Sequence, residues 1–439
     1  MGIKGLAKLL SDEAPDCIRD VPLKSLQGRR IAVDASMAIY QFLIAVRSGG
    51  PNAAAMMLTN AEGETTSHIQ GLFNRTIRFL TEGIRPAYVF DGKPPNIKSG
   101  ELEKRREKRE KAELELQAAK EEGNVEEEEK QSKRLVRAGK KENEDCMKLL
   151  ELMGVPVIKA PCEAEAQASA MARKGLVYAV ATEDMDALTF QAPVLLRKMT
   201  FANAKTDLQT MNYDKALKGL EITHDQFVDL CILLGCDYCD SIRGIGPKTA
   251  LKLVKDHGCI ENILKKIDKK KFGVPDSWIP NEIREQKKKE AKMKKEEEEY
   301  NTDDEKEKEK DVKEDPQAKE EEDEEEELIP IYVQARKLFN DHEVNTDLEL
   351  KWEACKAEEL TTFLVDEMGF NSDRVKSNIE RLQKAFKSTS KPQSRMDSFF
   401  KVMPSKNADK IAAKRKAAKE AEKAKSKKAK KGGSFGRRR

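Results

Sequence analysis

The stretch RRIAVDASMAIYQFLIAV, residues 29–46, decides the fold class of this chain. Its first part, RRIAVDAS, is a short apolar run that predicts a buried strand ending at Asp34. Its second part, SMAIYQFLIAV, has the length and apolar content of a helix. Two more apolar runs come later, AYVF before Asp91 and LVYAVAT before Glu183. Strands that alternate with helices predict an α/β fold with a mostly parallel central sheet flanked by helices.

Acidic side chains follow all three predicted strands. Asp34 and Asp91 stand at the ends of the first two strands, and Asp184 comes two residues after the third. Sites in open α/β sheets lie beyond the carboxyl ends of the strands, so these carboxylates are expected on one rim. Glu163 and Glu165 lie in the first turn of a predicted helix, whose positive end stabilises them. The complete candidate set is Asp34, Asp91, Glu163, Glu165, Asp184, Asp186 and Asp237.

Carboxylates this close together repel one another unless a cation lies between them. Ligation by oxygen alone suits Mg²⁺ or Mn²⁺ rather than zinc. Two such ions can activate a water molecule and stabilise the leaving oxygen of a phosphodiester. Any single aspartate is better explained as a helix cap or turn residue, so the metal prediction rests on the whole set.

Charge is distributed in long blocks along the chain. Charged residues make up 37% of the 439 residues, yet the net charge is only +3. Residues 98–145 are charged without a continuous apolar face, which predicts a solvated helical excursion. Residues 281–327 are rich in Lys and Glu and cannot bury a core, so disorder is predicted there. A basic tail, also predicted to be disordered, occupies residues 402–439.

Three observations bear on the compartment. No apolar run approaches the roughly 20 residues that a membrane span requires. The start, MGIKGLAKLLSDEAPD, is too polar for a signal peptide. The eight cysteines are scattered. A soluble intracellular protein with reduced thiols and no membrane partner is therefore expected.

Two short motifs have competing interpretations. Cys231, Cys236 and Cys239 have the spacing of plant-type iron–sulfur ligands. The residues between the first two read as a buried helix, which favours small buried hydrophobic side chains instead. The glycine turn at Gly244 and Gly246 opens a helix and presents free backbone N–H groups to a phosphate. An ordinary packing corner between two helices explains that motif equally well.

Several long motifs occur in order along the chain: MGIKGLAKLL, VDASMAIYQFLIAVR, YVFDGKPP, KSGEL, EAEAQ, ATEDMDALTF, LLGCDYC and RGIGPKTA. In this order they resemble the eukaryotic flap endonucleases, within the family of 5′ nucleases related to the excision-repair nuclease. The resemblance covers about residues 1–280, resumes near Leu328 and includes the C-terminal QSRMDSFF. It departs at residues 281–327, an insertion that the usual member lacks, and at Cys236, where Ser is common.

The resemblance implies roles for individual residues. All seven carboxylates bind two Mg²⁺ ions, for which Mn²⁺ can substitute. Lys98 and Arg105 stabilise the scissile phosphate, and Tyr40 stacks on a base near the cut. The residues implied in DNA binding are Arg47, Arg75, Glu163, Gly235, Asp237, Gly244, Gly246 and Lys248.

The resemblance also implies a domain organisation. The charged helical segment is an arch through which the 5′ flap passes, and the glycine turn belongs to a helix–two-turn–helix that holds duplex DNA around a K⁺ ion. The predicted ranges are 1–109 for the N-terminal nuclease region, 98–145 for the arch, 127–263 for the internal nuclease region, 281–327 for the insertion, 328–387 for the C-terminal part of the core, 393–401 for a sliding-clamp motif and 402–439 for the basic tail.

The function implied is a structure-specific 5′ flap endonuclease with 5′–3′ exonuclease activity, serving Okazaki fragment maturation and long-patch base excision repair. Its partners are flapped, nicked or gapped DNA and the proliferating cell nuclear antigen clamp, bound through Gln393, Met396, Phe399 and Phe400. The basic tail is typical of a nuclear-import signal or a DNA-binding arm. The resemblance implies the nucleus, with nucleolus and nucleoplasm, and the mitochondrion as a second compartment. A clamp-bound DNA-binding adaptor without activity is the alternative from another class, and a repair nuclease with a different preferred substrate is the third.

Overall fold

The computed structural model describes residues 2–47, 66–135, 139–199, 207–268, 272–278 and 329–389. The predictions for the insertion, the clamp motif and the basic tail therefore fall outside the described residues.

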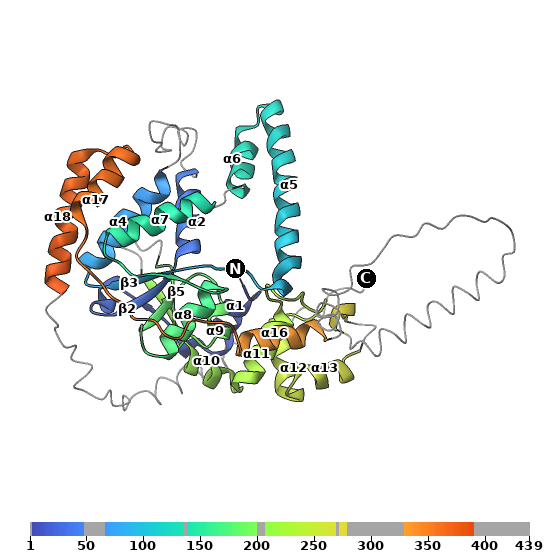
Figure 1. The fold of residues 1–439 in the computed structure, drawn as a ribbon. Coiled ribbons are helices and arrows are strands. Elements are labelled where there is room, and N and C mark those ends of the chain that lie inside the picture. Colours follow the sequence, from blue (N-terminus) through green and yellow to red (C-terminus); the bar gives the residue numbers. More distant parts are fainter. Residues whose placement is uncertain are drawn as a thin grey trace, which may run out of the picture. The chain divides into compact units, whose positions relative to one another are not determined.

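Seven strands in the described part of the chain form one sheet, in the order β1-β7-β6-β5-β2-β3-β4 (Figure 1). Neighbours from β6 through β5, β2 and β3 to β4 are parallel, whereas β6, β7 and β1 pair antiparallel. The prediction of a mostly parallel sheet is confirmed, with an antiparallel edge that makes the sheet mixed. The strands are β1 Ile18–Val21, β2 Arg30–Asp34, β3 Arg85–Phe90, β4 Val157–Lys159, β5 Ala179–Ala181, β6 Val194–Arg197 and β7 Leu208–Asn212.

The central strands are buried on both faces, which explains their continuous apolar sequences. In β2, Ile31 and Val33 pack into the core on one face and Ala32 into the core on the other. This matches the alternation of side chains along a strand. The strand signal at residues 29–36 was therefore strong because both faces needed apolar side chains.

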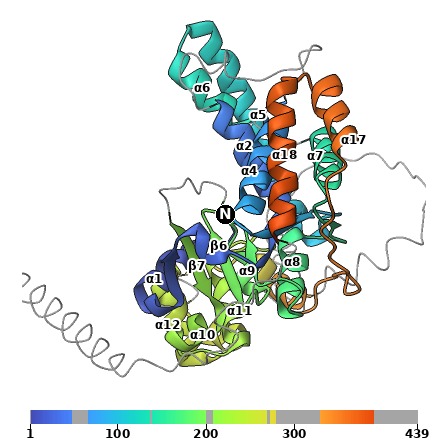
Figure 2. The same ribbon diagram turned by 90° about the vertical axis from the view of Figure 1, so that its left-hand side faces the viewer.

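Helices cover the two faces separately (Figures 1 and 2). One face is covered by α2 Ala35–Arg47, α4 Ser67–Thr81, α7 Lys140–Leu152, α17 Ala357–Thr362 and α18 Ser372–Thr389. The other is covered by α1 Leu6–Glu13, α8 Ala164–Arg173, α9 Asp186–Thr189, α10 Tyr213–Leu220, α11 His224–Leu234, α12 Pro247–His257, α13 Ile260–Lys266 and α16 Ile331–Asn340.

The charged segment after residue 98 forms two helices that pack on each other, α5 Ser99–Glu122 and α6 Val125–Arg134. They project from the other described helices in Figures 1 and 2. Ala112 and Ala119 are the residues of α5 that are buried. Gly123 ends the helix with a φ of 68°, a left-handed conformation that glycine adopts without steric cost. We call α5 and α6 the arch helices.

The C-terminal segment joins the core through specific polar contacts. Arg336 on α16 forms ion pairs with Asp229 on α11 and Glu261 on α13, each at 2.7 Å. Trp352 Nε1 donates a hydrogen bond to the Pro86 carbonyl at 2.7 Å. Residues 329–389 are thus an integral part of the described fold.

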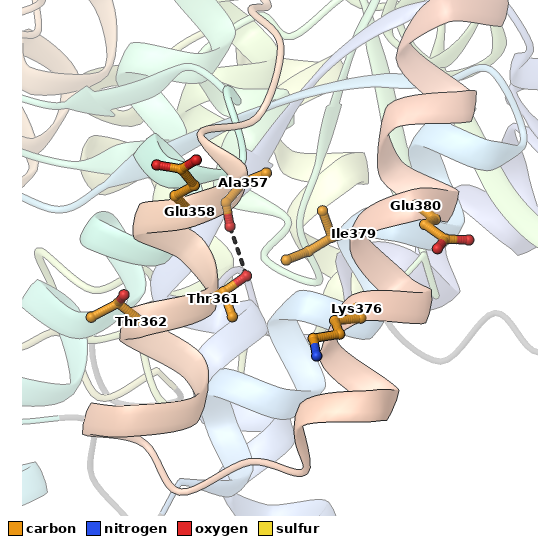
Figure 3. A pocket seen from close by; sticks show the side chains of 7 residues that line it. All are labelled: Ala357, Glu358, Thr361, Thr362, Lys376, Ile379 and Glu380. Carbon is orange, nitrogen blue, oxygen red and sulfur yellow. Dashed lines mark hydrogen bonds between the residues drawn. The ribbon is translucent and has the colours of Figure 1, made fainter.

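A groove of about 520 Å³ lies between α17 and α18 (Figure 3). Its lining mixes Lys376 with Glu358 and Glu380, and Thr361 donates a hydrogen bond to the Ala357 carbonyl at 2.7 Å. The two carboxylates come from different helices and share no buried partner, so the groove offers no catalytic set. Among the described residues, no helix is long and apolar enough to cross a membrane.

Candidate active site

The strand-end aspartates lie together at the carboxyl edge of the parallel strands. Asp34 is the last residue of β2 and is 4% exposed. Its carboxylate accepts hydrogen bonds from Met37 N at 3.0 Å and from Thr182 Oγ1 at 2.9 Å. The same hydroxyl accepts from Asp184 N at 3.1 Å. Thr182 therefore links the Asp34 carboxylate, at the end of β2, to the backbone of Asp184, which follows the neighbouring strand β5.

The start of α8 brings two glutamates to this edge. Asp91, just after β3, accepts a hydrogen bond from Ala164 N, the first N–H of α8, at 2.9 Å. Gly92 allows this close approach, since a Cβ there would collide with the carbonyls of Ala160 and Pro161. Glu163 caps α8 and Glu165 lies in its first turn.

Asp186 and Asp237 complete the set. Asp186 begins α9, is 5% exposed and donates its backbone N–H to Asp184 Oδ1 at 3.0 Å. Its own Oδ1 is buried and has no hydrogen-bond partner among the described residues. Asp237 follows α11 by three residues. We call these seven residues the carboxylate edge: Asp34, Asp91, Glu163, Glu165, Asp184, Asp186 and Asp237.

Burial and mutual repulsion favour the protonated forms of several of these carboxyls. Burial, and then the charge of Asp91, raises the pKa of Asp34 to about 7. Burial also raises the pKa of Glu165, Asp184 and Asp186, and neighbouring carboxylates add to it. A cation among these oxygens would offset both causes, because it favours the charged form.

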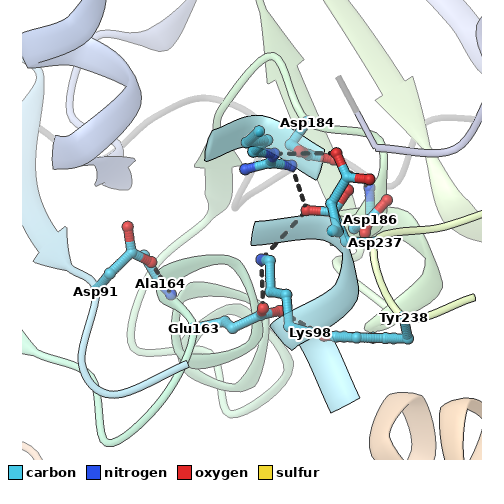
Figure 4. Close-up of polar contacts among 10 residues, drawn as sticks. Asp91, Lys98, Glu163, Ala164, Asp184, Asp186, Asp237 and Tyr238 are labelled. Carbon is cyan, nitrogen blue, oxygen red and sulfur yellow. Dashed lines mark hydrogen bonds and ion pairs between the residues drawn. The ribbon is translucent and has the colours of Figure 1, made fainter. Parts of the chain in front are cut away.

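Two basic side chains reach the carboxylate edge from α5 and the turn before it (Figure 4). Lys98 Nζ lies 2.5 Å from Glu163 Oε1 and 3.2 Å from Asp237 Oδ2. Arg105 Nη2 lies 2.8 Å from the same Asp237 oxygen. Burial opposes the charged form of Lys98, but Glu163 and Asp237 outweigh it and raise its pKa. Tyr238 donates its hydroxyl to Glu163 Oε2.

A cavity of about 1000 Å³ opens between the carboxylate edge and the arch helices. Tyr40 of α2 and Gly235 at the end of α11 line it, beside Asp237. Basic residues of the arch helices supply much of the remaining wall. They are Arg105, Lys108, Arg109, Lys111 and Arg134. A cavity that borders the carboxylate edge at Asp237 and has cations on its wall suits a phosphodiester chain.

The donor set fits hard divalent cations, although the side chains are not arranged around a single ion. Among the described residues, no three His, Cys, Asp or Glu side chains converge in the geometry of a metal site. The Lys98 ammonium instead lies beside Glu163 and Asp237, where it acts as their counter-ion. Asp186 Oδ1 is buried without a hydrogen-bond partner among the described residues, so it is available to bind a cation.

Comparison with known proteins identifies the family. Residues 1–112 match the XPG N-terminal domain and residues 154–237 match the XPG I-region. The chain is 68% identical to flap endonuclease 1 of Phaeodactylum tricornutum, over 95% of this chain and 96% of that protein. The chain belongs to the flap endonuclease 1 family. Membership makes it a nuclease, a hydrolase of phosphodiester bonds.

Solved structures agree with this membership. The flap endonuclease-1 of Methanococcus jannaschii is 30% identical, with a TM-score of 0.57 over 86% of this chain and 98% of that one. The catalytic core of Rad2 in complex with DNA substrate is 24% identical, with a TM-score of 0.56 over 87% of this chain and 100% of that one. The second likeness shows the shared fold alone.

Two arginines predicted to bind DNA are not among the residues that line the cavity. Arg75 of α4 is half-buried, with its guanidinium 4.0 Å from the centre of the Phe42 ring. Burial lowers the pKa of Arg75 to about 10. The side chain of Arg47 lies outside the described part of the structure. Their DNA contacts remain predictions.

The glycine turn lies between α11 and α12. Gly244 has a φ of 91° and Gly246 caps α12. Lys248 is exposed on the first turn of that helix, 3.9 Å from Asp12. The sequence placed this turn correctly before a helix, and both the phosphate-binding and the packing interpretations stay open.

Sequence reasoning missed three residues that shape the site. Thr182 joins the Asp34 carboxylate to the backbone N–H of Asp184, Tyr238 binds Glu163, and Gly2 packs against Asp184 and Asp186. A side chain at Gly2 would collide with the carboxylates of Asp184 and Asp186. Tyr238 could have been found from its place next to Asp237, whereas Thr182 and Gly2 are not adjacent to any candidate residue.

Proposed function

We propose that the chain is a structure-specific endonuclease that cuts DNA at the base of 5′ flaps and also has 5′–3′ exonuclease activity. One observation carries the proposal: Lys98 and Arg105 pair with Glu163 and Asp237 of the carboxylate edge, and Arg105 and Asp237 line a cavity beside the arch helices. The names of its relatives support the flap as substrate. The preserved carboxylate edge argues against a clamp-bound adaptor without activity.

Two Mg²⁺ ions are proposed at the carboxylate edge, with Mn²⁺ as a substitute. An all-oxygen donor set and the orphaned Asp186 oxygen support this choice. When bound, such ions supply an activated water and stabilise the leaving oxygen. The seven residues of the carboxylate edge would hold the pair, and Ala164 N fixes Asp91 at the start of α8 for that role.

The protein's own side chains would position the DNA. Lys98 and Arg105 already lie beside carboxylates at the base of the cavity, so their cationic groups would hold the scissile phosphate there. Tyr40 on the cavity wall would stack on a base near the cut. Duplex DNA would rest on Gly244, Gly246 and Lys248, with a K⁺ ion held by turn carbonyls.

The test is cleavage of an end-labelled 5′ flap with Mg²⁺ or with EDTA. We expect Mg²⁺-dependent cutting at the flap base, and none by the Asp184→Ala variant, which should still bind the flap because phosphate contacts elsewhere persist. Near wild-type cutting by that variant would reject the metal assignment. Greater activity on bubbles than on flaps would favour a repair nuclease with a different substrate.

We further propose that Gln393, Met396, Phe399 and Phe400 bind the proliferating cell nuclear antigen clamp. The support is the sequence QSRMDSFF, whose two aromatics are typical anchors of short-motif interfaces. Replication and repair roles, and a nuclear location with nucleolar, nucleoplasmic and mitochondrial pools, belong to the same proposal.

The clamp proposal is tested with the double variant Phe399→Ala and Phe400→Ala. Cleavage of free flaps should be unchanged, while stimulation by the clamp should be lost, because the anchors are removed without touching the nuclease core. Clamp affinity equal to that of the unaltered chain, measured by calorimetry, would show that the motif is not the binding site.

A further inference from the structure

A pair of thiols flanks the carboxylate that Lys98 and Arg105 share. Cys236 and Cys239 stand on either side of Asp237 and Tyr238, just after α11. Cys236 N donates a hydrogen bond to the Cys239 carbonyl at 3.2 Å, which makes the two residues an antiparallel bridge. Their sulfur atoms lie 3.6 Å apart. The mechanism proposed above uses neither thiol.

The backbone geometry of this pair suits a disulfide. Residues opposite each other in an antiparallel hydrogen-bonded pair have Cα atoms about 5.5 Å apart, with side chains on the same face. Disulfides most often join Cα atoms about 5.5 to 6 Å apart. The sulfurs therefore need only a local adjustment of the two-residue turn to reach the roughly 2.05 Å of a bond.

We propose that Cys236 and Cys239 form an oxidisable pair, a modification site whose disulfide form weakens cleavage. The consequence for activity rests on the proposed function, because Asp237 matters only if the carboxylate edge binds catalytic metal. The existence of the disulfide does not depend on it. All eight cysteines are free thiols in the structure, so the pair is described in its reduced form.

A hydroperoxide is the oxidant class that completes the chemistry. The thiolate of one cysteine attacks a peroxide oxygen, the O–O bond breaks, and a sulfenic acid and hydroxide form. The second thiol then attacks the sulfenic sulfur, an S–S bond forms, and water leaves. Two thiols are oxidised and one hydroperoxide is reduced. A thiol reductant reverses the modification by thiol–disulfide exchange.

The turn between the thiols carries the contacts that oxidation would disturb. Asp237 holds Lys98 at 3.2 Å and Arg105 at 2.8 Å, and Tyr238 binds Glu163. Drawing the sulfurs together from 3.6 Å must shift this turn. Misplacing a reacting group by 1 Å can cost about a hundredfold in rate. We expect the disulfide to slow flap cleavage by about tenfold or more.

The experiment treats the reduced full-length chain with a hydrogen peroxide series. Mass spectrometry after alkylation maps the disulfide, and flap cleavage is measured before oxidation, after it and after dithiothreitol. We expect a Cys236–Cys239 linkage whose yield follows the loss of cleavage, with recovery on reduction. A linkage that leaves cleavage unchanged, or cleavage lost without the linkage, overturns the proposal.

Matched variants locate the effect. Cys239→Ser should cut flaps normally and keep its activity in peroxide, whereas Cys355→Ser, on the C-terminal segment, should lose activity as the unaltered chain does. Equal inactivation of Cys239→Ser overturns the proposal. If Cys239→Ser proves unstable by thermal unfolding, the mapped linkage and its reversal in the unaltered chain decide alone. Absence of cleavage by the reduced chain would instead count against the proposed function.

Discussion

The carboxylate edge and the arch helices are both dense in charge, but they carry it differently. At the carboxylate edge, Asp34, Asp184 and Asp186 are less than 10% exposed and depend on hydrogen bonds and on one another. On the arch helices, pairs such as Arg106 and Glu110 lie 3.5 Å apart with both side chains 64% exposed. Water solvates the charges of the arch helices, whereas the protein itself must stabilise those of the carboxylate edge.

This contrast separates charges that serve the chemistry of the site from charges that keep a surface solvated. Exposed ion pairs contribute about 0 to 1 kcal/mol each, so the charges of the arch helices can change with little effect on folding. Buried like charges raise each other's pKa and destabilise the fold unless a cation joins them. A protein retains such a cluster only where its chemistry is needed.

The largest expected effect comes from neutralising a buried carboxylate. Asp186→Asn should reduce cleavage to below about a thousandth, beyond the loss of a single electrostatic contact. The same change should stabilise the metal-free protein by about 1 kcal/mol, because it removes the cost of burying or protonating a carboxyl among like charges. Flap cleavage and thermal unfolding in EDTA measure the two effects.

The matched control for that prediction is Glu110→Gln on α5, which should leave both measurements nearly unchanged. If Asp186→Asn instead cuts flaps at a normal rate, or if both variants lose activity equally, the contrast between the two regions would not hold.

A smaller effect is expected from the two lysines near the start of α5. Lys98→Met should slow cleavage about a hundredfold, since its ammonium contacts Glu163 and Asp237 at the cavity base. Lys104→Met breaks a 2.5 Å pair with Asp240, but both side chains are well exposed. An exposed ion pair of this kind contributes less than about 1 kcal/mol to stability. The cleavage rate of Lys104→Met should therefore stay near that of the unaltered chain. Single-turnover rates at saturating flap compare the two, and equal losses would contradict the argument from burial.

The smallest effect concerns a buried histidine. His68 of α4 is 3% exposed, and neither ring nitrogen has a hydrogen-bond partner among the described residues. Burial lowers its pKa, so the unfolded chain takes up the proton first as pH falls below about 6.5. Stability is therefore kept above that pH and lost below it.

His68→Met should remove this component of the pH dependence. Between pH 7 and pH 5, the unfolding midpoint of the variant should fall by a few degrees less than that of the unaltered chain. Parallel pH profiles for the two proteins would show that His68 is not the group that titrates.

Much of the fold was predictable because both faces of the central strands are buried. The runs ending at Asp34 and Asp91 read as strands at once, and the structure places β2 and β3 there. The antiparallel edge was not predicted. β1 is IRDV and β7 is LQTMN, short strands with polar residues whose pairing depends on each other. Such edge pairs leave little periodic signal in a sequence.

The site was predictable to the extent that topology fixes it. Asp34, Asp91 and Asp184 were found from their place after strands, which parallel pairing turns into a shared edge. Thr182 was not found, because a hydroxyl that joins the carboxylate of one strand end to the backbone N–H of another has no characteristic spacing in the sequence. Lys98 came from a resemblance alone, since its contacts with Glu163 and Asp237 span 65 residues or more.

The ion pairs of Arg336 with Asp229 and Glu261 join two parts of the chain that residues 279–328 separate in the sequence. Residues before 279 and after 328 are held together by these pairs, by the Trp352 contact with Pro86 and by a shared apolar core. Peptide continuity across 279–328 is thus not what keeps the two parts associated. A chain cut there by a protease would remain assembled, and two separately made fragments would combine into one working nuclease.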